Sequence, residues 1–128
     1  NLAISLHASN DELRTKIMQI NKKYSLKNVF EAVDEYIKKT KRQVMFEYIS
    51  IRDVNDSDEL AEELAELMKK KLYFLNLILY NPTGDFLPSL PESVESFKKV
   101  LEKNKIKFSQ RYRFGDNANA ACGQFIIK

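Results

Sequence analysis

The chain has 128 residues, 44% of them hydrophobic and 30% charged, and 21 Lys and Arg against 18 Asp and Glu give a net charge of +3. This length supports one hydrophobic core rather than two. A single cysteine excludes an internal disulfide, and the longest apolar stretch, Leu72 to Tyr80, is too short to cross a membrane. We therefore expect one cytoplasmic globular unit without a membrane partner, and the small charge excess does not by itself indicate a nucleic-acid partner.

Four segments have the apolar pattern of β-strands. The second and third are almost continuously apolar, which is typical of strands that are covered on both faces of a sheet. The predicted strands are Leu2 to Leu6, Val44 to Ile51, Tyr73 to Leu79 and Ile106 to Tyr112.

Helical periodicity fills the intervals between these strands, with helices predicted to begin after Ser9, Ser25, Asp56 and Ser89. Asp56 and Glu59 have the spacing of a capping box, and Lys69-Lys70-Lys71 suits the negative end of that helix dipole. Strict alternation of strands and helices predicts an α/β fold with a mainly parallel sheet, because each helix must cross back over the sheet.

Polar residues follow the carboxyl ends of the predicted strands, where ligands bind in sheets of this kind. They are Ser5-Leu6-His7, Asp53-Val54-Asn55-Asp56, Asn81-Pro82 and a terminal loop with Cys122. We expect all four groups to lie at one edge of the sheet. Singly, His7 also suits a structural role and Asn55-Asp56 a helix cap.

The only cysteine, Cys122, lies between Ala121 and Gly123. These small neighbours leave the sulfur open to a ligand, so the position favours a chemical role. Inert packing and an ordinary thiol nucleophile are the alternatives.

Several other chemistries are excluded by what they require. The glycines at 84, 115 and 123 are too far apart for a phosphate-binding loop. One cysteine and one histidine cannot complete a structural zinc site, so we predict no metal ligand in this chain.

Six ordered segments together carry a family resemblance. They are Leu2 to Ala8, Met18 to Tyr24, Phe46-Glu47-Tyr48, Val54 to Ser57, Asn76-Leu77-Ile78 with Tyr80-Asn81-Pro82, and Ala120 to Gln124. In this order they resemble the radical S-adenosylmethionine RNA methyltransferases, and most closely the dual-specificity family that methylates carbon 2 of an adenine in 23S rRNA and in tRNA. Phe114 before Gly115 looks more like the related carbon-8 resistance enzymes, but the balance favours carbon 2.

The resemblance implies roles for particular residues. The cysteine that matches Cys122 would be methylated by one S-adenosylmethionine, and a radical derived from a second would take hydrogen from that methyl group before its carbon adds to the adenine. Ser5, Leu6, His7 and Asn81 would contact S-adenosylmethionine. Arg111 and Arg113, beside the terminal loop, are our candidates for RNA phosphate contacts.

The resemblance also implies a longer enzyme, since the three cysteines that bind its 4Fe-4S cluster belong to the upstream half of the family. We expect residues 1–128 to be the carboxyl-terminal portion, in which residues 1–113 form about half of a partial TIM-like (β/α) barrel and residues 114–128 form the cysteine-bearing loop. Alone it would be inactive, and the full enzyme would use an electron donor such as flavodoxin. Strand Leu2 to Leu6 would be an exposed sheet edge through which the isolated chain can dimerise.

The terminal loop departs from the family pattern at Phe114, Asn117 and Asn119, where an arginine and two acidic residues are usual. These changes alter the electrostatics beside Cys122, so a different RNA target or a degenerate copy is an alternative. The alternative from another class is a non-catalytic α/β module that binds RNA, in which Cys122 is incidental.

Overall fold

The computed structural model describes residues 2–18, 23–81 and 86–114, with only the backbone described at 80, 81, 113 and 114. Within them the elements are β1 (Leu2–Ser5), α1 (Asp11–Ile17), α2 (Leu26–Thr40), β2 (Val44–Ser50), α3 (Asp58–Leu67), β3 (Tyr73–Asn81), α4 (Pro91–Lys103) and β4 (Phe108–Phe114). None of these described helices is both long and apolar enough to span a membrane.

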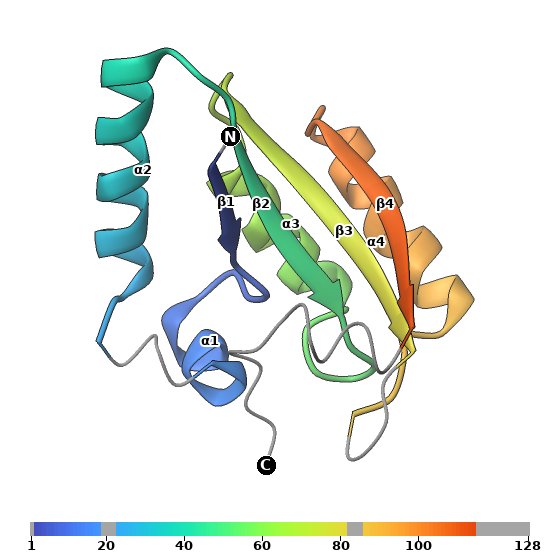
Figure 1. Cartoon of the computed structure of the whole chain (residues 1–128). Coiled ribbons are helices and arrows are strands. Elements are labelled where there is room, and N and C mark those ends of the chain that lie inside the picture. The colour runs from blue at the N-terminus through green and yellow to red at the C-terminus, as the bar shows by residue number, and fades with distance from the viewer. Residues whose placement is uncertain (1, 19–22, 82–85, 115–128) are drawn as a thin grey trace.

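The four strands form one parallel sheet in the order β1-β2-β3-β4. Figure 1 shows the strands running in one direction, so that their carboxyl ends meet at one edge of the sheet. The predicted alternating α/β fold is thereby confirmed, with strand ends that differ by at most two residues. The predicted exposed edge is also confirmed, because β1 pairs with β2 alone among the described strands.

The main hydrophobic core lies between the sheet and helices α2, α3 and α4. Phe30 of α2 stacks on Phe46 of β2 with ring centroids 5.2 Å apart, and Phe97 of α4 packs against Tyr48 at 5.5 Å. Phe46 and Tyr48 lie two residues apart on one strand and therefore on one face. The three long helices thus cover the same side of the sheet, with α3 and α4 behind it in Figure 1 and α2 beside its β1 edge.

The other face of the sheet agrees only in part with the prediction that β2 and β3 are covered on both sides. Helices α2, α3 and α4 do not cover it, and Met45 and Glu47 are half-buried there, whereas Ile49, Ile78 and Asn76 are at most 2% exposed. Its apolar residues form a separate small cluster of Ile49, Ile51 and Ile78 with Val54 and Phe86. We call this side the uncovered face. Because Ile49 and Ile78 on this face are apolar, the sequences of β2 and β3 do not show the alternation of apolar and polar residues that is typical of a strand covered on one side.

Two of the predicted helix caps are wrong. Asn10 rather than Ser9 caps α1, because its Oδ1 accepts from the Leu13 N–H at 2.8 Å, while the Ser9 hydroxyl donates to Glu63 of α3 at 2.6 Å. Ser57 rather than Asp56 caps α3, and its hydroxyl accepts from the Leu60 N–H at 3.2 Å. In both places two adjacent residues have suitable side chains, and tertiary contacts decide which one caps.

The other two helix starts agree better with the sequence. Ser25 caps α2 as predicted, and its hydroxyl accepts from the Asn28 N–H at 3.3 Å. Helix α4 begins at Pro91 without a side-chain cap, since the preceding Leu90 cannot accept a hydrogen bond.

The lysine run after α3 has a different role from the predicted one. Helix α3 ends at Leu67 and has no basic residue in its last turn. Lys69 instead pairs with Glu66 at 2.7 Å, and Lys70 reaches Asp34 of α2 at 2.7 Å. Both are surface ion pairs, and the one made by Lys70 connects α2 to the segment after α3.

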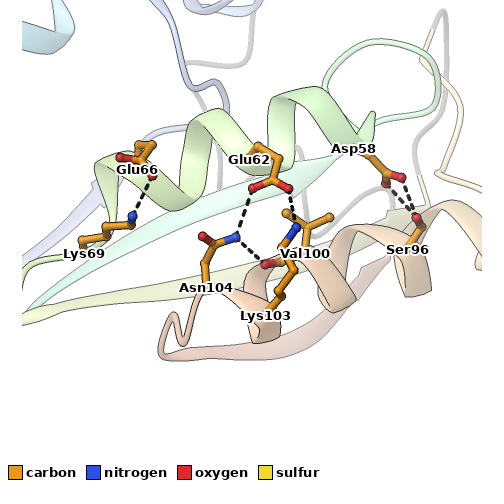
Figure 2. Close-up of polar contacts among 8 residues, drawn as sticks. All are labelled: Asp58, Glu62, Glu66, Lys69, Ser96, Val100, Lys103 and Asn104. Carbon is orange, nitrogen blue, oxygen red and sulfur yellow. Dashed lines mark hydrogen bonds and ion pairs between the residues drawn. The ribbon is translucent and has the colours of Figure 1, made fainter.

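Polar contacts link α3 to α4 outside the core, as Figure 2 shows. The Ser96 hydroxyl lies 2.7 and 2.9 Å from the two carboxylate oxygens of Asp58. Further along, Glu62 accepts from Lys103 at 3.0 Å and from Asn104 at 3.1 Å. Exposed pairs of this kind add little stability, so their main effect is to fix how the two helices align.

Asp34 connects α2 to β3. It accepts from the Tyr73 hydroxyl at 2.5 Å and from Lys70. Burial raises the pKa of Asp34, but the hydrogen bonds from Lys70 and Tyr73 outweigh it and hold the pKa below its usual 3.8. Burial and the neighbouring carboxylate raise the pKa of Tyr73. Ionised Asp34 thus helps to hold α2 on the sheet.

Replacing Leu64, which is 0% exposed, tests the core between the sheet and α3. Leu64→Ala should lower the free energy of unfolding by about 2 to 5 kcal/mol, because it removes buried methyl groups and leaves a cavity. Leu87, which is 53% exposed, provides the control, and Leu87→Ala should change stability by less than about 0.5 kcal/mol. Urea denaturation measures both, and equal effects would contradict the assigned core.

Asp34→Asn tests the α2 contact through its pH dependence. The folded-state pKa is lowered, so the stability that ionised Asp34 adds is present above its unfolded value of 3.8 and is lost as the pH falls through the folded value. The variant should be slightly less stable than the wild type at pH 7, by less than about 1 kcal/mol. This difference should shrink as the pH falls below 3.8. Denaturation curves across pH that stay a constant distance apart would count against this contact.

Candidate functional site

The structure brings together two of the four polar groups predicted at the carboxyl edge. The Asn55 side chain donates from Nδ2 to the His7 carbonyl at 2.9 Å, which joins the loop after β2 to the end of β1. Asn81 is the last residue of β3 and pairs with Phe114, but its side chain lies outside the described residues. Cys122 also lies outside the described residues, so its role stays a prediction.

The three residues predicted at the end of β1 differ in what they offer a ligand. Leu6 is 0% exposed and belongs to the main core, so only its backbone could contact a ligand. His7 is buried, and its Nδ1 accepts from the Ile49 N–H at 3.0 Å. Because Nδ1 accepts there, the ring proton of the neutral imidazole sits on Nε2. Ser5 is half-buried on the uncovered face, where its hydroxyl can face a ligand.

A row of polar residues crosses the uncovered face at one level of the sheet. The strand register places Ser5 beside Glu47, Glu47 beside Asn76 and Asn76 beside Ser109. The Ser109 hydroxyl donates to Asn76 Oδ1 at 2.7 Å. We call these four residues the polar row. A carboxylate, an amide and two hydroxyls give this face both donors and acceptors of hydrogen bonds.

The sequence prediction did not identify the polar row as a unit. Glu47 and Asn76 each interrupt an otherwise apolar strand, and that interruption was the available signal. What the sequence alone does not contain is the register that aligns them with Ser5 and Ser109. Nothing in the local sequence marked Arg14, whose buried guanidinium donates to the Ser5 carbonyl at 2.8 Å. Burial lowers the pKa of Arg14, although Asp11 nearby opposes this shift.

The two predicted RNA-binding arginines lie on β4. Arg111 is exposed and pairs in register with Ile78. It is two residues from Ser109, so it lies on the uncovered face beyond the polar row. Arg113 pairs with Tyr80, and its side chain lies outside the described residues. The positive charge of Arg111 is therefore placed beside the hydrogen-bonding groups of the same face.

An acidic groove of about 550 Å³ lies between the beginnings of α3 and α4. Its lining includes the carboxylates of Asp53, Asp56, Asp58 and Glu92. Negative charge repels phosphate, so this groove disfavours RNA. Across the described segments, no group of three or more His, Cys, Asp or Glu is arranged to hold a metal ion.

The chain has close relatives among known proteins, although no family model matches it. It is 54% identical over 128 residues to a probable dual-specificity RNA methyltransferase RlmN of Malacoplasma penetrans, covering 100% of this chain and 36% of the relative. It is 49% identical over 133 residues to the protein of the same name from Enterococcus faecalis, covering 100% of this chain and 37% of that relative. The chain therefore spans little more than a third of the length of the curated relatives it matches.

Solved structures agree with this similarity. A radical SAM methyltransferase from Sphaerobacter thermophilus matches with a TM-score of 0.84 and 39% identity, over 97% of this chain and 37% of that one. A domain of a pyruvate-formate lyase-activating enzyme from Bacteroides vulgatus matches with a TM-score of 0.65 and 16% identity, over 85% of this chain and 65% of that one, and this likeness supports the fold alone. The resemblance inferred from the six sequence segments is confirmed. By sequence and fold, the chain is therefore similar to one part of the dual-specificity RNA methyltransferases named RlmN and to one part of a radical SAM methyltransferase.

Proposed function

We propose that residues 1–128 are the carboxyl-terminal portion of a longer enzyme that methylates carbon 2 of an adenine in 23S rRNA and in tRNA. In this proposal residues 1–113 supply about half of a partial barrel, and residues 114–128 carry the reactive cysteine. The observation that carries the proposal is a parallel sheet with a polar row on its uncovered face, in a chain that is 54% identical to an RlmN relative. The names of the relatives favour carbon 2 over carbon 8.

The uncovered face suits S-adenosylmethionine. The hydroxyl of Ser5 and the carboxylate of Glu47, both half-buried, provide a donor and acceptors in one row, which match the hydroxyl and amino groups of that molecule. Asn76, which is 2% exposed and accepts from Ser109, supports this row from within the sheet. In this proposal Ser5, the backbone of Leu6 and His7, and Asn81 hold it. When bound, S-adenosylmethionine supplies the methyl group and the radical chemistry.

The residues of this chain do not fit a 4Fe-4S cluster. The sequence has one cysteine and one histidine, whereas such clusters are held by several cysteine thiolates. We therefore assign the cluster ligands to the remainder of the longer enzyme and derive no step from this chain through the cluster.

Cys122 has the central chemical role in this proposal. Its sulfur binds the transferred methyl group, and it presents that carbon to the adenine ring. Ala121 and Gly123 have little or no side chain, which leaves space for the methylated sulfur to approach the base.

The proposed partners follow from the surface of the described residues. Arg111, and Arg113 in the same strand, would contact RNA phosphates. An apolar groove of about 580 Å³ runs between the free edge of β1 and α2, and in the longer enzyme it would receive the preceding strands of the barrel. Without that cover, the isolated chain would dimerise through β1. A cytoplasmic location and an electron donor such as flavodoxin complete the proposal.

Cys122→Ala tests the proposed chemistry in the full-length, reconstituted enzyme. The variant should lose adenine carbon-2 methylation, because no sulfur remains to carry the methyl group. Mass spectrometry of the wild-type peptide that contains Cys122 should show the added mass of one methylene, because a methyl group replaces the thiol hydrogen. Normal methylation by Cys122→Ala would overturn the assignment.

Arg111→Gln tests the proposed RNA contact. Loss of one phosphate contact should weaken RNA binding and reduce the slope of log K against log salt by about 0.7 to 0.9. Arg42 is also exposed but lies just before β2, at the opposite edge of the sheet, so Arg42→Gln provides the control. Filter binding across a salt series measures both variants, and identical slopes would exclude Arg111 from the RNA contact.

A further inference from the structure

The end of β1 contains a residue in an unfavourable backbone conformation. His7 has a φ of 57°, in the left-handed region that few residues other than glycine adopt. Lys41, Asp53 and Lys105 also have a positive φ, so the conformation alone does not mark a functional site, but it persists only where its surroundings fix it. The contacts that fix His7 therefore identify residues on which the site depends.

Side chains from two other segments hold the carbonyl groups of three consecutive residues here. Arg14 of α1 donates from Nη2 to the Ser5 carbonyl at 2.8 Å and from Nε to the Leu6 carbonyl at 3.1 Å. Asn55 donates from Nδ2 to the His7 carbonyl at 2.9 Å. The backbone N–H groups of Leu6 and His7 both donate to the Glu47 carbonyl, at 2.8 and 3.2 Å. The segment is thus fixed through its donors and its acceptors.

Asn55 is itself held on several sides. It is 0% exposed, its Nδ2 also donates to the Ile49 carbonyl at 2.7 Å, and its Oδ1 accepts from the Ile51 N–H at 2.8 Å. Its own carbonyl accepts from the buried Tyr48 hydroxyl at 2.6 Å. An amide with this many fixed partners cannot rotate without breaking several hydrogen bonds. Asn55 therefore fixes the position of the His7 carbonyl relative to β2.

Arg14 has a similar role from the other side of the segment. It is 4% exposed, and its third contact is with the Tyr24 carbonyl at 3.3 Å. The planar guanidinium is suited to this task because its donors have a fixed geometry, which lysine lacks. Arg14 thus sets the positions of the Ser5 and Leu6 carbonyls relative to one another.

We infer that Asn55 and Arg14 are positioning residues, which hold Ser5, Leu6 and His7 in the geometry that receives S-adenosylmethionine. This inference rests on the proposed function, since it assumes that the segment binds that molecule. Neither residue needs to touch the ligand. They act by keeping the Ser5 hydroxyl on the uncovered face and His7 in its left-handed conformation.

Binding of radiolabelled S-adenosylmethionine to the full-length, reconstituted protein, measured by equilibrium dialysis, tests the inference. Asn55→Ala should raise the Kd roughly tenfold or more, because the His7 carbonyl loses its donor. Leu64→Ala removes a core side chain outside this network and controls for lost stability. Asn104→Ala controls for the chemistry, since Asn104 also donates to a backbone carbonyl, that of Val100 at 2.8 Å, but at the end of α4. Both controls should keep the wild-type Kd within about twofold, as expected when stability and binding are separate.

The outcomes separate the inference from the proposed function. If the wild type binds S-adenosylmethionine and a folded Asn55→Ala binds it equally well, the inference is wrong and the proposed function stands. If Leu64→Ala weakens binding as much as Asn55→Ala does, the effect is general destabilisation and the inference also fails. Should Asn55→Ala not fold, Arg14→Lys carries the same expectation, since lysine cannot reach both carbonyls in a fixed geometry. A wild-type protein that does not bind S-adenosylmethionine would overturn the proposed function itself.

Discussion

The placement of three helices on one face of a parallel sheet is the constraint on which the rest of this structure depends. The aromatic residues of β2 and β3 bury that face against α2, α3 and α4, so the hydrophobic core is complete on one side. The other face is then free to carry polar groups without loss of the core. Because neighbouring parallel strands are in register, Ser5, Glu47, Asn76 and Ser109 form one row there. The proposed function depends on this division between a face that packs against the helices and a face that carries the polar row.

The end of β1 contains neighbouring residues that lie on the two faces of the sheet. Leu6 lies in the core and the adjacent Ser5 lies on the uncovered face, so the end of β1 belongs to both. Its geometry is therefore sensitive to the packing behind it and to the hydrogen bonds of Arg14 and Asn55 around it. A ligand site built on this segment gains rigidity from the core, which reduces the free-energy cost of ordering it on binding.

The sequence predicted the elements well because their signals are local. Apolar runs and helical periodicity identified all four strands and all four helices of the described residues, and six motifs indicated the resemblance that the relatives confirm. The errors arose where the outcome depends on tertiary contacts: Ser9 bonds Glu63 and leaves the cap to Asn10, and Lys70 after α3 pairs with Asp34 of α2. The polar row could not be predicted, since it requires the register between strands. The roles of Asn81, Arg113 and Cys122 stay predictions.

A crystal structure of the full-length protein with S-adenosylmethionine would test the central claim most directly. We expect the ligand to lie on the uncovered face, within hydrogen-bond distance of the Ser5 hydroxyl and beside the end of β3. The Ser5 to His7 segment should keep the conformation described above, including the left-handed His7. A ligand bound in the acidic groove between α3 and α4, with the uncovered face empty, would contradict the claim.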